Sequence, residues 1–260
     1  MKKFFYLMLV VALVASCEND GVSSNPVENP SDPDRLEFTV EGVSFKMIKV
    51  EGGTFLMGSE IGNFNEEPVH SVTLSGYYIG ETEVTQEMWQ AVMGSNPSEF
   101  KGDNLPVERV SWDDCQEFIS KLNQKTGRRF ALPTEAQWEF AARGGNKSQG
   151  YKYSGSNNID DVAWYWNNSS EQTHPVGTKM ANELGLYDMS GNVWEWCADC
   201  YGSYSPSSQT DPVGPSTGAV RVYRGSSWSY NAGYCRSTYR GRNSPDYRGD
   251  DLGIRLVLLF

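Results

Sequence analysis

Basic charge is scarce in this sequence: 22 lysines and arginines stand against 33 aspartates and glutamates, so the formal net charge of the 260 residues is −11. A nucleic-acid-binding surface needs clustered basic side chains to neutralise phosphates, and electrostatic docking on anionic lipid needs them too. The composition therefore argues against both kinds of partner. An acidic balance of this size favours solubility and indicates nothing more specific.

Long apolar runs are missing as well. The run Phe4–Ala15 has twelve residues, whereas a transmembrane helix needs ~20. Two lysines precede this run, and Ser16 and Cys17 follow it. A short basic region, an apolar stretch and small residues together predict a secretory signal peptide over residues 1–16.

The segment Val14–Cys17, Val-Ala-Ser-Cys, is typical of a bacterial lipobox, in which the cysteine thiol takes lipid. An ordinary secretory signal with a chance cysteine is the alternative. A lipid on Cys17 predicts a protein anchored in the bacterial cell envelope, on the periplasmic or surface face of the outer membrane, and attached through its acyl chains only. Residues 17–35 contain three prolines and almost no large apolar residue, so they predict a flexible tether to a folded domain, residues 36–260.

Histidine and cysteine are few. The chain has two histidines, and four cysteines remain after Cys17. Cys197 and Cys200 have the spacing of a Cys-x-x-Cys motif, but a zinc site needs two further ligands, and a redox motif should open a helix after a strand. In an oxidising compartment four cysteines allow up to two disulfides with three connectivities, and the spacing alone leaves the pairing open.

The folded part shows neither internal repeats nor the strand–helix alternation of a parallel sheet. Alternating apolar residues predict strands over residues 36–50 and 72–79, and two more strands close the chain near residues 220–224 and 253–259. Helices are predicted where a capping residue precedes apolar residues at helical spacing and a glycine follows: Thr85–Met93, Ser111–Lys125 and Thr134–Arg143. The roughly 75 residues after Gly145 carry few regular signals. The predicted fold class is α+β, a single loop-rich domain with little regular secondary structure.

Nine short motifs follow one another through the folded part. They are Gly52–Gly58 (GGTFLMG), Glu67–Val72 (EPVHSV), Glu83–Thr85 (EVT), Pro106–Trp112 (PVERVSW), Leu132–Glu139 (LPTEAQWE), His174–Gly177 (HPVG), Gly185–Trp196 (GLYDMSGNVWEW), Arg224–Trp228 (RGSSW) and Gly253–Arg255 (GIR). In this order and spacing they resemble the formylglycine-generating enzyme, or sulfatase-modifying factor, family over roughly residues 45–260. The resemblance implies a variant of the C-type-lectin-like fold.

The resemblance also implies a chemistry that this chain departs from. Enzymes of that family oxidise a cysteine within Cys-x-Pro-x-Arg of a sulfatase to formylglycine, using oxygen and a copper(I) ion held by two cysteine thiolates. Thiolates are the soft ligands that copper(I) prefers. Carried onto this sequence, the second cysteine falls on Cys235 and the first on Tyr230. A phenol is not a thiolate at neutral pH, so copper binding is not expected.

Other cleft positions of the family match this chain. By resemblance, Ser227, Trp194 and Tyr234 line the active-site cleft beside Cys235, which is a tentative catalytic residue. Ordinary core packing is the alternative for the two aromatic residues. For Cys235 the preferred alternative is a structural disulfide with Cys197, a bridge that would stabilise the fold by ~3–4 kcal/mol.

The segment Asp188–Glu195 predicts a structural calcium site. Two carboxylates bracket a tight Gly-Asn turn, and calcium takes hard oxygen ligands from side chains and loop carbonyls. By resemblance the ligands are the side chains of Asp188 and Glu195 and the carbonyls of Gly191 and Val193. A solvated or salt-bridged acidic pair is the alternative.

Two functions follow from these patterns. The favoured one is a non-catalytic binding or scaffold module on the cell envelope, with a protein or glycan partner, because one cysteine of the copper pair is missing. The alternative is a copper- and oxygen-dependent oxidase that makes formylglycine, which would require Cys235 to pair with another sulfur. A related sulfoxide-synthase reading is excluded, since its iron domain needs three histidines and the chain has two.

Overall fold

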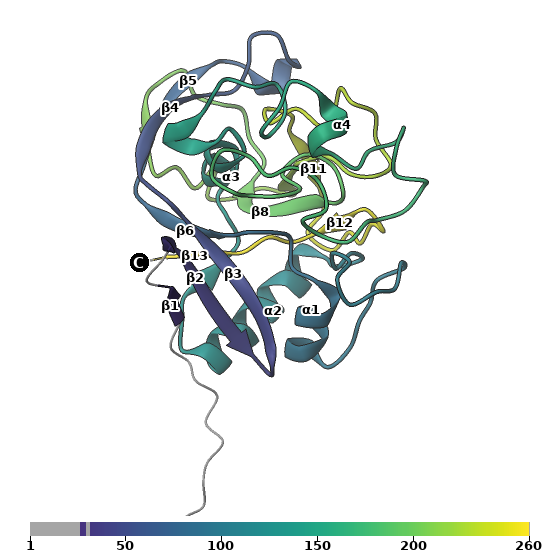
Figure 1. Ribbon diagram of the computed structural model, residues 1–260. Helices are drawn as coiled ribbons and strands as arrows, with labels where there is room; N and C mark the ends of the chain where they lie inside the picture. The colour runs from purple at the N-terminus through teal and green to yellow at the C-terminus, as the bar shows by residue number, and fades with distance from the viewer. Residues whose placement is uncertain (1–26, 30–31, 260) are drawn as a thin grey trace, which may run out of the picture.

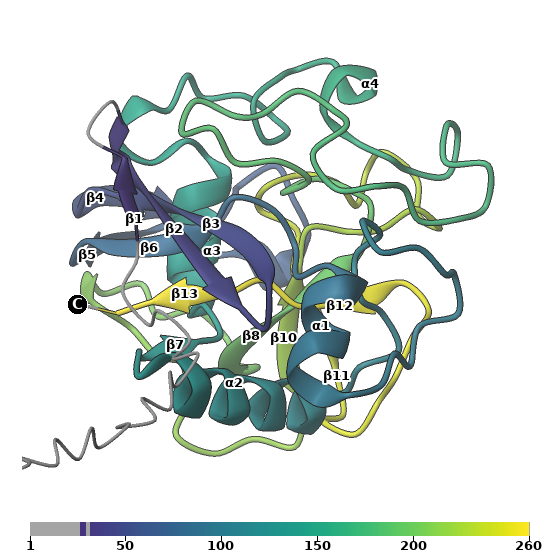
Figure 2. The ribbon, with the colours of Figure 1, turned by 60° about the horizontal axis from the view of Figure 1, so that its bottom comes forward.

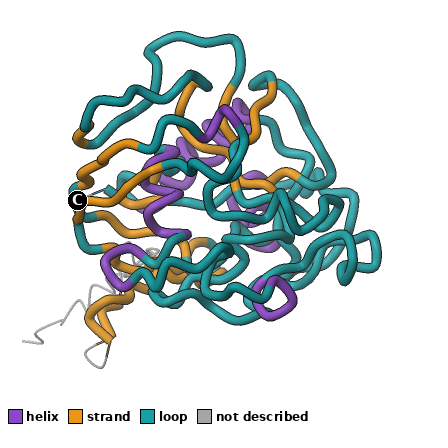
Figure 3. Tube along the Cα trace, turned by 90° about the horizontal axis from the view of Figure 1, so that it is seen from above, coloured by secondary structure: helices purple, strands orange, loops and turns teal. Residues whose placement is uncertain are grey.

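The computed structural model describes residues 27–29 and 32–259, with side chains from residue 34 onwards. The predicted signal peptide and the lipid on Cys17 lie outside the described residues. The described part forms a single unit of short helices and strands joined by long loops, as Figures 1 and 3 show. No helix in these residues has the length and apolar character to span a bilayer. The predicted α+β, loop-rich class is confirmed.

The largest sheet has six strands, and every neighbouring pair in it is antiparallel. Its order is β1 (Val27–Asn29), β2 (Asp32–Val40), β3 (Val43–Val50), β6 (Tyr77–Gly80), β13 (Val257–Leu258) and β7 (Phe130–Ala131). Strand β13, close to the C-terminal end of the chain, therefore pairs with β6, which comes from the first third of the sequence.

The first strands of this sheet correct the expected tether. The prediction placed a flexible segment over residues 17–35, but Val27–Asn29 pairs with β2, and β2 already begins at Asp32. Of the three prolines that suggested a tether, Pro33 lies near the start of β2, and a proline is tolerated at such a position because it does not need to donate a backbone N–H there. The folded part thus begins before residue 36.

Two smaller sheets complete the strand structure. One has four strands in the order β11 (Gly241–Asn243), β10 (Arg221–Arg224), β8 (Trp194–Cys200) and β12 (Leu252–Gly253). The other has three strands, β4 (Gly53–Met57), β5 (His70–Leu74) and β9 (Gln209–Thr210). The four-stranded sheet supplies Trp194, and the loop between β10 and β11 supplies the other positions that the resemblance placed in the cleft, Ser227, Tyr234 and Cys235.

The three predicted helices are present, each with the expected start and end. They are α1 (Gln86–Met93), α2 (Trp112–Thr126) and α3 (Glu135–Ala142). Thr85, Ser111 and Thr134 each accept a hydrogen bond from a first-turn N–H group, and α2 and α3 have a full capping box. The left-handed residues Gly94 and Gly127 end α1 and α2. A short helix, α4 (Ile159–Val162), and two 3-10 turns, η1 (Phe64–Glu66) and η2 (Gly145–Lys147), carry weaker signals.

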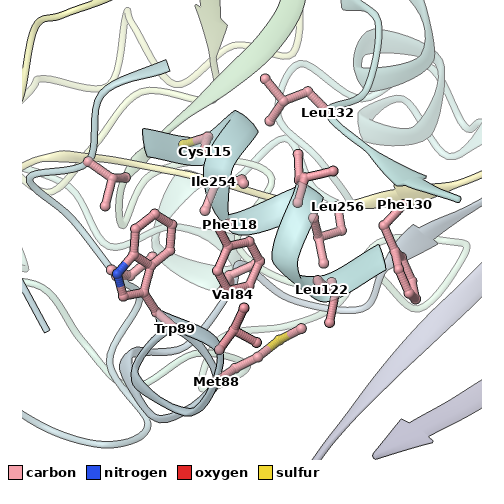
Figure 4. Close-up of a cluster of buried hydrophobic side chains, with 14 of the residues drawn as sticks. Val84, Met88, Trp89, Cys115, Phe118, Leu122, Phe130, Leu132, Ile254 and Leu256 are labelled. Atoms are coloured by element: carbon pink, nitrogen blue, oxygen red, sulfur yellow. The ribbon is translucent and has the colours of Figure 1, made fainter. Parts of the chain in front are cut away.

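Helices α1 and α2 pack together over one hydrophobic core. The rings of Trp89 and Phe118 stack between them, with centroids 4.7 Å apart and planes 1° from parallel. Figure 4 shows both rings among Met88, Leu122 and Ile254. Figure 2 shows α2 lying along one side of the molecule next to α1. The apolar face predicted for α2 is therefore buried against the rest of the domain.

The strand predictions were less accurate at their ends. The stretch predicted as one strand over residues 72–79 is split at Ser75 and Gly76 into β5 and β6, which belong to different sheets. The C-terminal stretch is likewise split into β12 and β13. Strand β8 was not predicted: it is buried almost throughout, yet it carries Glu195 and Asp199, and acidic residues are depleted in strands.

We predict that Phe118→Ala lowers the free energy of unfolding by about 3–5 kcal/mol, because it removes a fully buried ring and leaves a cavity beside Trp89. Ser120→Ala, two residues further along α2 on its exposed side, is the control and should stay within about 0.5 kcal/mol of the parent. Urea unfolding followed by circular dichroism measures both. Equal, small effects would contradict the packing described for α2.

Candidate functional site

The candidate cleft forms where the loop after β10 meets the start of β8. The loop leaves Arg224 through Gly225 and Ser226, both of which have positive φ angles, 96° and 69°. A Cβ atom on Gly225 would lie 3.1 Å from the Trp138 ring, so the turn needs glycine on both conformational and steric grounds. This turn carries Ser227 toward the cleft, and Trp194 is supplied by β8.

Aromatic rings fill the place where the resemblance expected a pair of thiolates. The Tyr230 ring packs edge to face on the Trp194 ring, with centroids 5.3 Å apart. Its centroid also lies 5.1 Å from that of the tilted Tyr234 ring. Tyr239 joins both, at 5.8 Å from Trp194 and 4.8 Å from Tyr234, and Tyr223 meets Trp194 at 4.9 Å. The structure therefore brings Trp194 and Tyr234 together as predicted, within a cluster of five rings that the sequence did not reveal in full.

The outer part of this cluster is open to solvent. A hollow of about 440 Å³ is lined by Trp166, Ser229, Tyr230, Asn231 and Tyr234. Trp166 is 55% exposed, which is unusual for an indole, and its backbone N–H is held by the Tyr230 carbonyl at 2.9 Å. The hollow thus offers ring faces, hydroxyls and one amide, without a charged side chain.

Cys235 is not among the residues that line this hollow. The residue is fully buried and packs with Tyr153, Val162, Ala163 and Tyr165. Burial raises the pKa of the Cys235 thiol to about 12, while the neighbouring Ser226 hydroxyl acts weakly in the opposite direction. A thiol in such surroundings stays protonated at neutral pH and is a poor nucleophile and a poor metal ligand.

The predicted disulfide between Cys197 and Cys235 is wrong. All four cysteines in the described residues are free and buried. Cys197 packs in the cluster of α3, β5 and β6, whereas Cys235 packs in the separate cluster next to α4. The two sulfurs are held in different parts of the core, so the disulfide that was preferred as the structural role of Cys235 is not made.

Ser227 is placed in a polar corner of the cleft, not beside the thiol. Its hydroxyl donates to Asp251 Oδ2 at 3.1 Å and lies 3.0 Å from the Ser229 hydroxyl, which bonds the same carboxyl oxygen at 3.1 Å. Burial raises the pKa of Asp251, although the two hydroxyls act in the opposite direction. Ser227 therefore orders the loop around Asp251.

A buried ion network lies behind the aromatic cluster, and sequence reasoning missed it. Arg224 is fully buried and pairs with Glu139 at 2.5 Å and Glu135 at 3.1 Å, both on α3. Arg240 forms two hydrogen bonds with the same Glu135, at 2.6 and 2.7 Å. Burial would raise the pKa of Glu139, but Arg143, 2.7 Å away on the same helix, and Arg224 hold it below its ordinary value. Three of these residues, Glu135, Glu139 and Arg224, lie within two of the nine motifs that carry the resemblance. No role was predicted for them from the sequence.

The segment predicted to bind calcium carries a second buried ion pair. Glu195 is fully buried, pairs with Arg255 at 2.7 Å and accepts a hydrogen bond from Trp138 Nε1 at 2.6 Å. Both carboxylate oxygens of Glu195 are therefore already engaged by a guanidinium and an indole. In this arrangement a cation at Glu195 would compete with Arg255, so Glu195 does not fit the ligand role that the resemblance gave it.

Asp188 fits a cation better. Its Oδ2 accepts a hydrogen bond from the Gly177 N–H at 2.7 Å, while Oδ1 is buried without a partner. Burial raises the pKa of Asp188 to about 6, and burial together with Asp188 and Glu195 raises that of nearby Glu83. No group of three or more potential metal-binding side chains gathers within the described residues. Of the two predicted side-chain ligands, Asp188 therefore has an oxygen without a partner and Glu195 has none, and the calcium site stays a prediction.

The turn between these carboxylates is sharply constrained. Gly191 has φ 84°, and a Cβ there would lie 2.3 Å from the Trp164 carbonyl oxygen. Its N–H donates to the Gly225 carbonyl at 2.8 Å, which ties this segment to the turn that opens the cleft. Val193 donates its N–H to Glu83 at 3.2 Å. The predicted calcium segment and the cleft are therefore parts of one hydrogen-bonded structure.

The family is decided by a comparison with known proteins. The sequence pattern of one protein family, the Sulfatase-modifying factor enzyme 1-like domain, matches residues 38–259, which is nearly all of the described part. This chain belongs to that family. The match agrees with the resemblance seen in the nine motifs, and it covers both the cleft and the ion networks behind it.

Named relatives of this sulfatase-modifying-factor-like protein fall into two kinds. Over 99% of both chains it is 33% identical to the "Chaperone protein LppX" of Paenibacillus barcinonensis. It is 31% identical to the formylglycine-generating enzyme of Streptomyces coelicolor, over 80% of this chain and 87% of that one. Among solved structures, Treponema denticola variable protein 1 is 36% identical with a TM-score of 0.82, covering 87% of this chain and 99% of that one. Enzyme and non-enzyme names thus occur at similar identity.

We predict that Cys235 resists alkylation in the folded protein. A thiol whose pKa is about 12 has roughly a thousand times less thiolate at pH 8 than an ordinary exposed cysteine. Iodoacetamide labelling followed by peptide mass spectrometry should therefore find Cys235 unlabelled when native and fully labelled after unfolding without reductant. Label on the native thiol would contradict the burial, and failure to label after unfolding would restore the disulfide.

Proposed function

We propose that this chain is a non-catalytic binding module of the bacterial cell envelope, anchored through lipid on Cys17 and directed at a protein or glycan partner. The observation that carries the proposal is the cleft itself. Tyr230 stands where the family's first thiolate would be, and Cys235 is buried among apolar side chains with a pKa of about 12. The two-thiolate copper chemistry of the related enzymes lacks both ligands in this arrangement.

The surroundings of the cleft support a binding role. Rings with a polar tip, such as Tyr230 and Tyr234, supply contact area and hydrogen bonds at little entropic cost, and such residues are enriched in recognition surfaces. Exposed Trp166 extends the same surface. Trp194, which is buried, packs against the Tyr230 ring, and the fully buried Arg224 holds the strand that leads into this loop.

The names of the relatives agree with this proposal without proving it. One relative of full-length similarity is named a chaperone protein, and the structure with a TM-score of 0.82 is named a variable protein. The alternative, an oxidase that converts a sulfatase cysteine to formylglycine, is supported by the Streptomyces coelicolor relative. That alternative would require Cys235 to turn out of its apolar cluster and find a second sulfur.

We predict no oxidation of a Cys-x-Pro-x-Arg peptide by the purified protein with copper(I) and oxygen, because neither thiolate ligand is available. Mass spectrometry follows the peptide, and the Streptomyces coelicolor enzyme is run beside it as the positive control. Aldehyde formation that disappears in Cys235→Ser would establish the oxidase and overturn the binding proposal.

We further propose that calcium braces the domain through Asp188, whose Oδ1 is buried without a hydrogen-bond partner. Saturating calcium should raise Tm by about 5–10 °C relative to EDTA, since a ligand bound only to the folded state stabilises it by mass action. The shift should vanish in Asp188→Asn and persist in Glu60→Gln, which changes an exposed carboxylate. A Tm that is independent of calcium would mean that Arg255 alone compensates this cluster.

A further inference from the structure

A second pocket, which shares no lining residue with the aromatic cleft, lies at the other end of the buried ion network. It has a volume of about 310 Å³, enough for a small organic molecule. Its walls come from the facing ends of β4, β5 and β8, from the start of α3 and from the loop that follows β8. Apolar surface is contributed by Met57, Val213 and the ring of Tyr204. The pocket is independent of the function proposed for the cleft.

Arg240, the basic side chain in the wall of this pocket, is already paired with a carboxylate. Arg240 gives four of its five N–H groups to protein acceptors: two to the Glu135 carboxylate, one to the Asn65 carbonyl at 2.7 Å and one to the Gly202 carbonyl at 3.1 Å. Tyr204 donates its hydroxyl to the same Glu135 at 3.2 Å. Little donor capacity is left for an anionic ligand, so phosphates and carboxylates are poor candidates.

Asp199 is a buried carboxyl whose negative charge the nearby Arg240 offsets only in part. Its side chain lines the pocket and is 4% exposed, and its Oδ2 accepts a hydrogen bond from the Glu135 N–H at 2.8 Å. Within the described part of the chain no lysine, arginine or histidine forms an ion pair with it. A buried carboxylate without a cationic partner is costly, and an incoming cation would relieve that cost.

His70, which also lines the pocket, has a second acceptor atom. His70 has Nδ1 2.9 Å from the Pro68 carbonyl, and a carbonyl only accepts, so Nδ1 carries the proton. In the neutral imidazole Nε2 is therefore an acceptor. The His70 ring lies 4.8 Å from the Tyr204 ring, beside the pocket. Two acceptors and an aromatic wall match a ligand that brings N–H donors and positive charge.

We propose that this pocket binds a small organic cation, with a primary ammonium group placed at Asp199 and an aliphatic chain against Met57 and Tyr204. The proposal rests on the cavity, on the saturated Arg240 and on the unpaired carboxyl. Burial and the nearby Glu135 raise the pKa of Asp199 to about 7, although Arg240 acts in the opposite direction. A bound ammonium group would stabilise the ionised form of this carboxyl.

The test uses n-butylamine as the probe on the full protein, with n-butanol and butyrate as neutral and anionic analogues. Binding is followed by the NMR signal of the Met57 methyl group, which reports on this pocket alone. Butylamine should saturate that shift with a Kd on the order of 0.1–1 mM, typical of so small a ligand. The two analogues should bind at least tenfold more weakly.

Asp199→Asn tests the role of the charge while keeping an oxygen that can accept from the Glu135 N–H. Affinity for butylamine should fall at least tenfold, and Asp103→Asn, at an exposed carboxylate, should leave it unchanged. If the Asp199 variant does not fold, the amine, alcohol and carboxylate series on the parent protein decides the matter. No saturable Met57 shift, equal binding of butyrate, or full affinity in a folded Asp199→Asn protein would each overturn the proposal.

Discussion

The buried pairing of Arg224 with Glu135 and Glu139 is the constraint on which the rest of the structure depends. It joins α3 to β10 inside the protein, and Arg240 adds a second cation on Glu135. Removing one partner of such a pair leaves an uncompensated buried charge and typically costs about 3–5 kcal/mol. The guanidinium of Arg224 also donates to the carbonyls of Ser237 and Thr238, so the chain on both sides of the cleft is held by one side chain.

This support explains how the cleft keeps its shape although Tyr230 stands where the resemblance places a thiolate. Trp194, Tyr230 and Tyr234 pack ring against ring above the network, and Glu195 with Arg255 fixes the strand that supplies Trp194. The frame that positions a reactive centre in the related enzymes here positions an aromatic surface. A framework that is stabilised by buried ion pairs beneath the cleft can vary the side chains that it presents to solvent.

The sequence predicted the parts of this fold whose signals are local. The capping residues and glycines located α1, α2 and α3 to within a residue or two, and the ordered motifs identified the family and the positions of Trp194 and Tyr234. Strand β8 was not predicted because it buries two acidic residues, Glu195 and Asp199, which are unusual in a strand. The Cys197–Cys235 pairing failed because spacing does not report which cluster a side chain enters. The ion network required knowing that Arg224 and Glu139, 85 residues apart, meet in the core.

The account rests most directly on the claim that this cleft offers no thiolate site for copper(I). Copper(I) affinity, measured anaerobically by competition with a coloured chelator on the parent protein and on Cys235→Ser, tests that claim without assuming any substrate. The account predicts that the two proteins compete equally and weakly, because the Cys235 thiol is buried and protonated. One equivalent of tightly held copper in the parent, lost in Cys235→Ser, would contradict it.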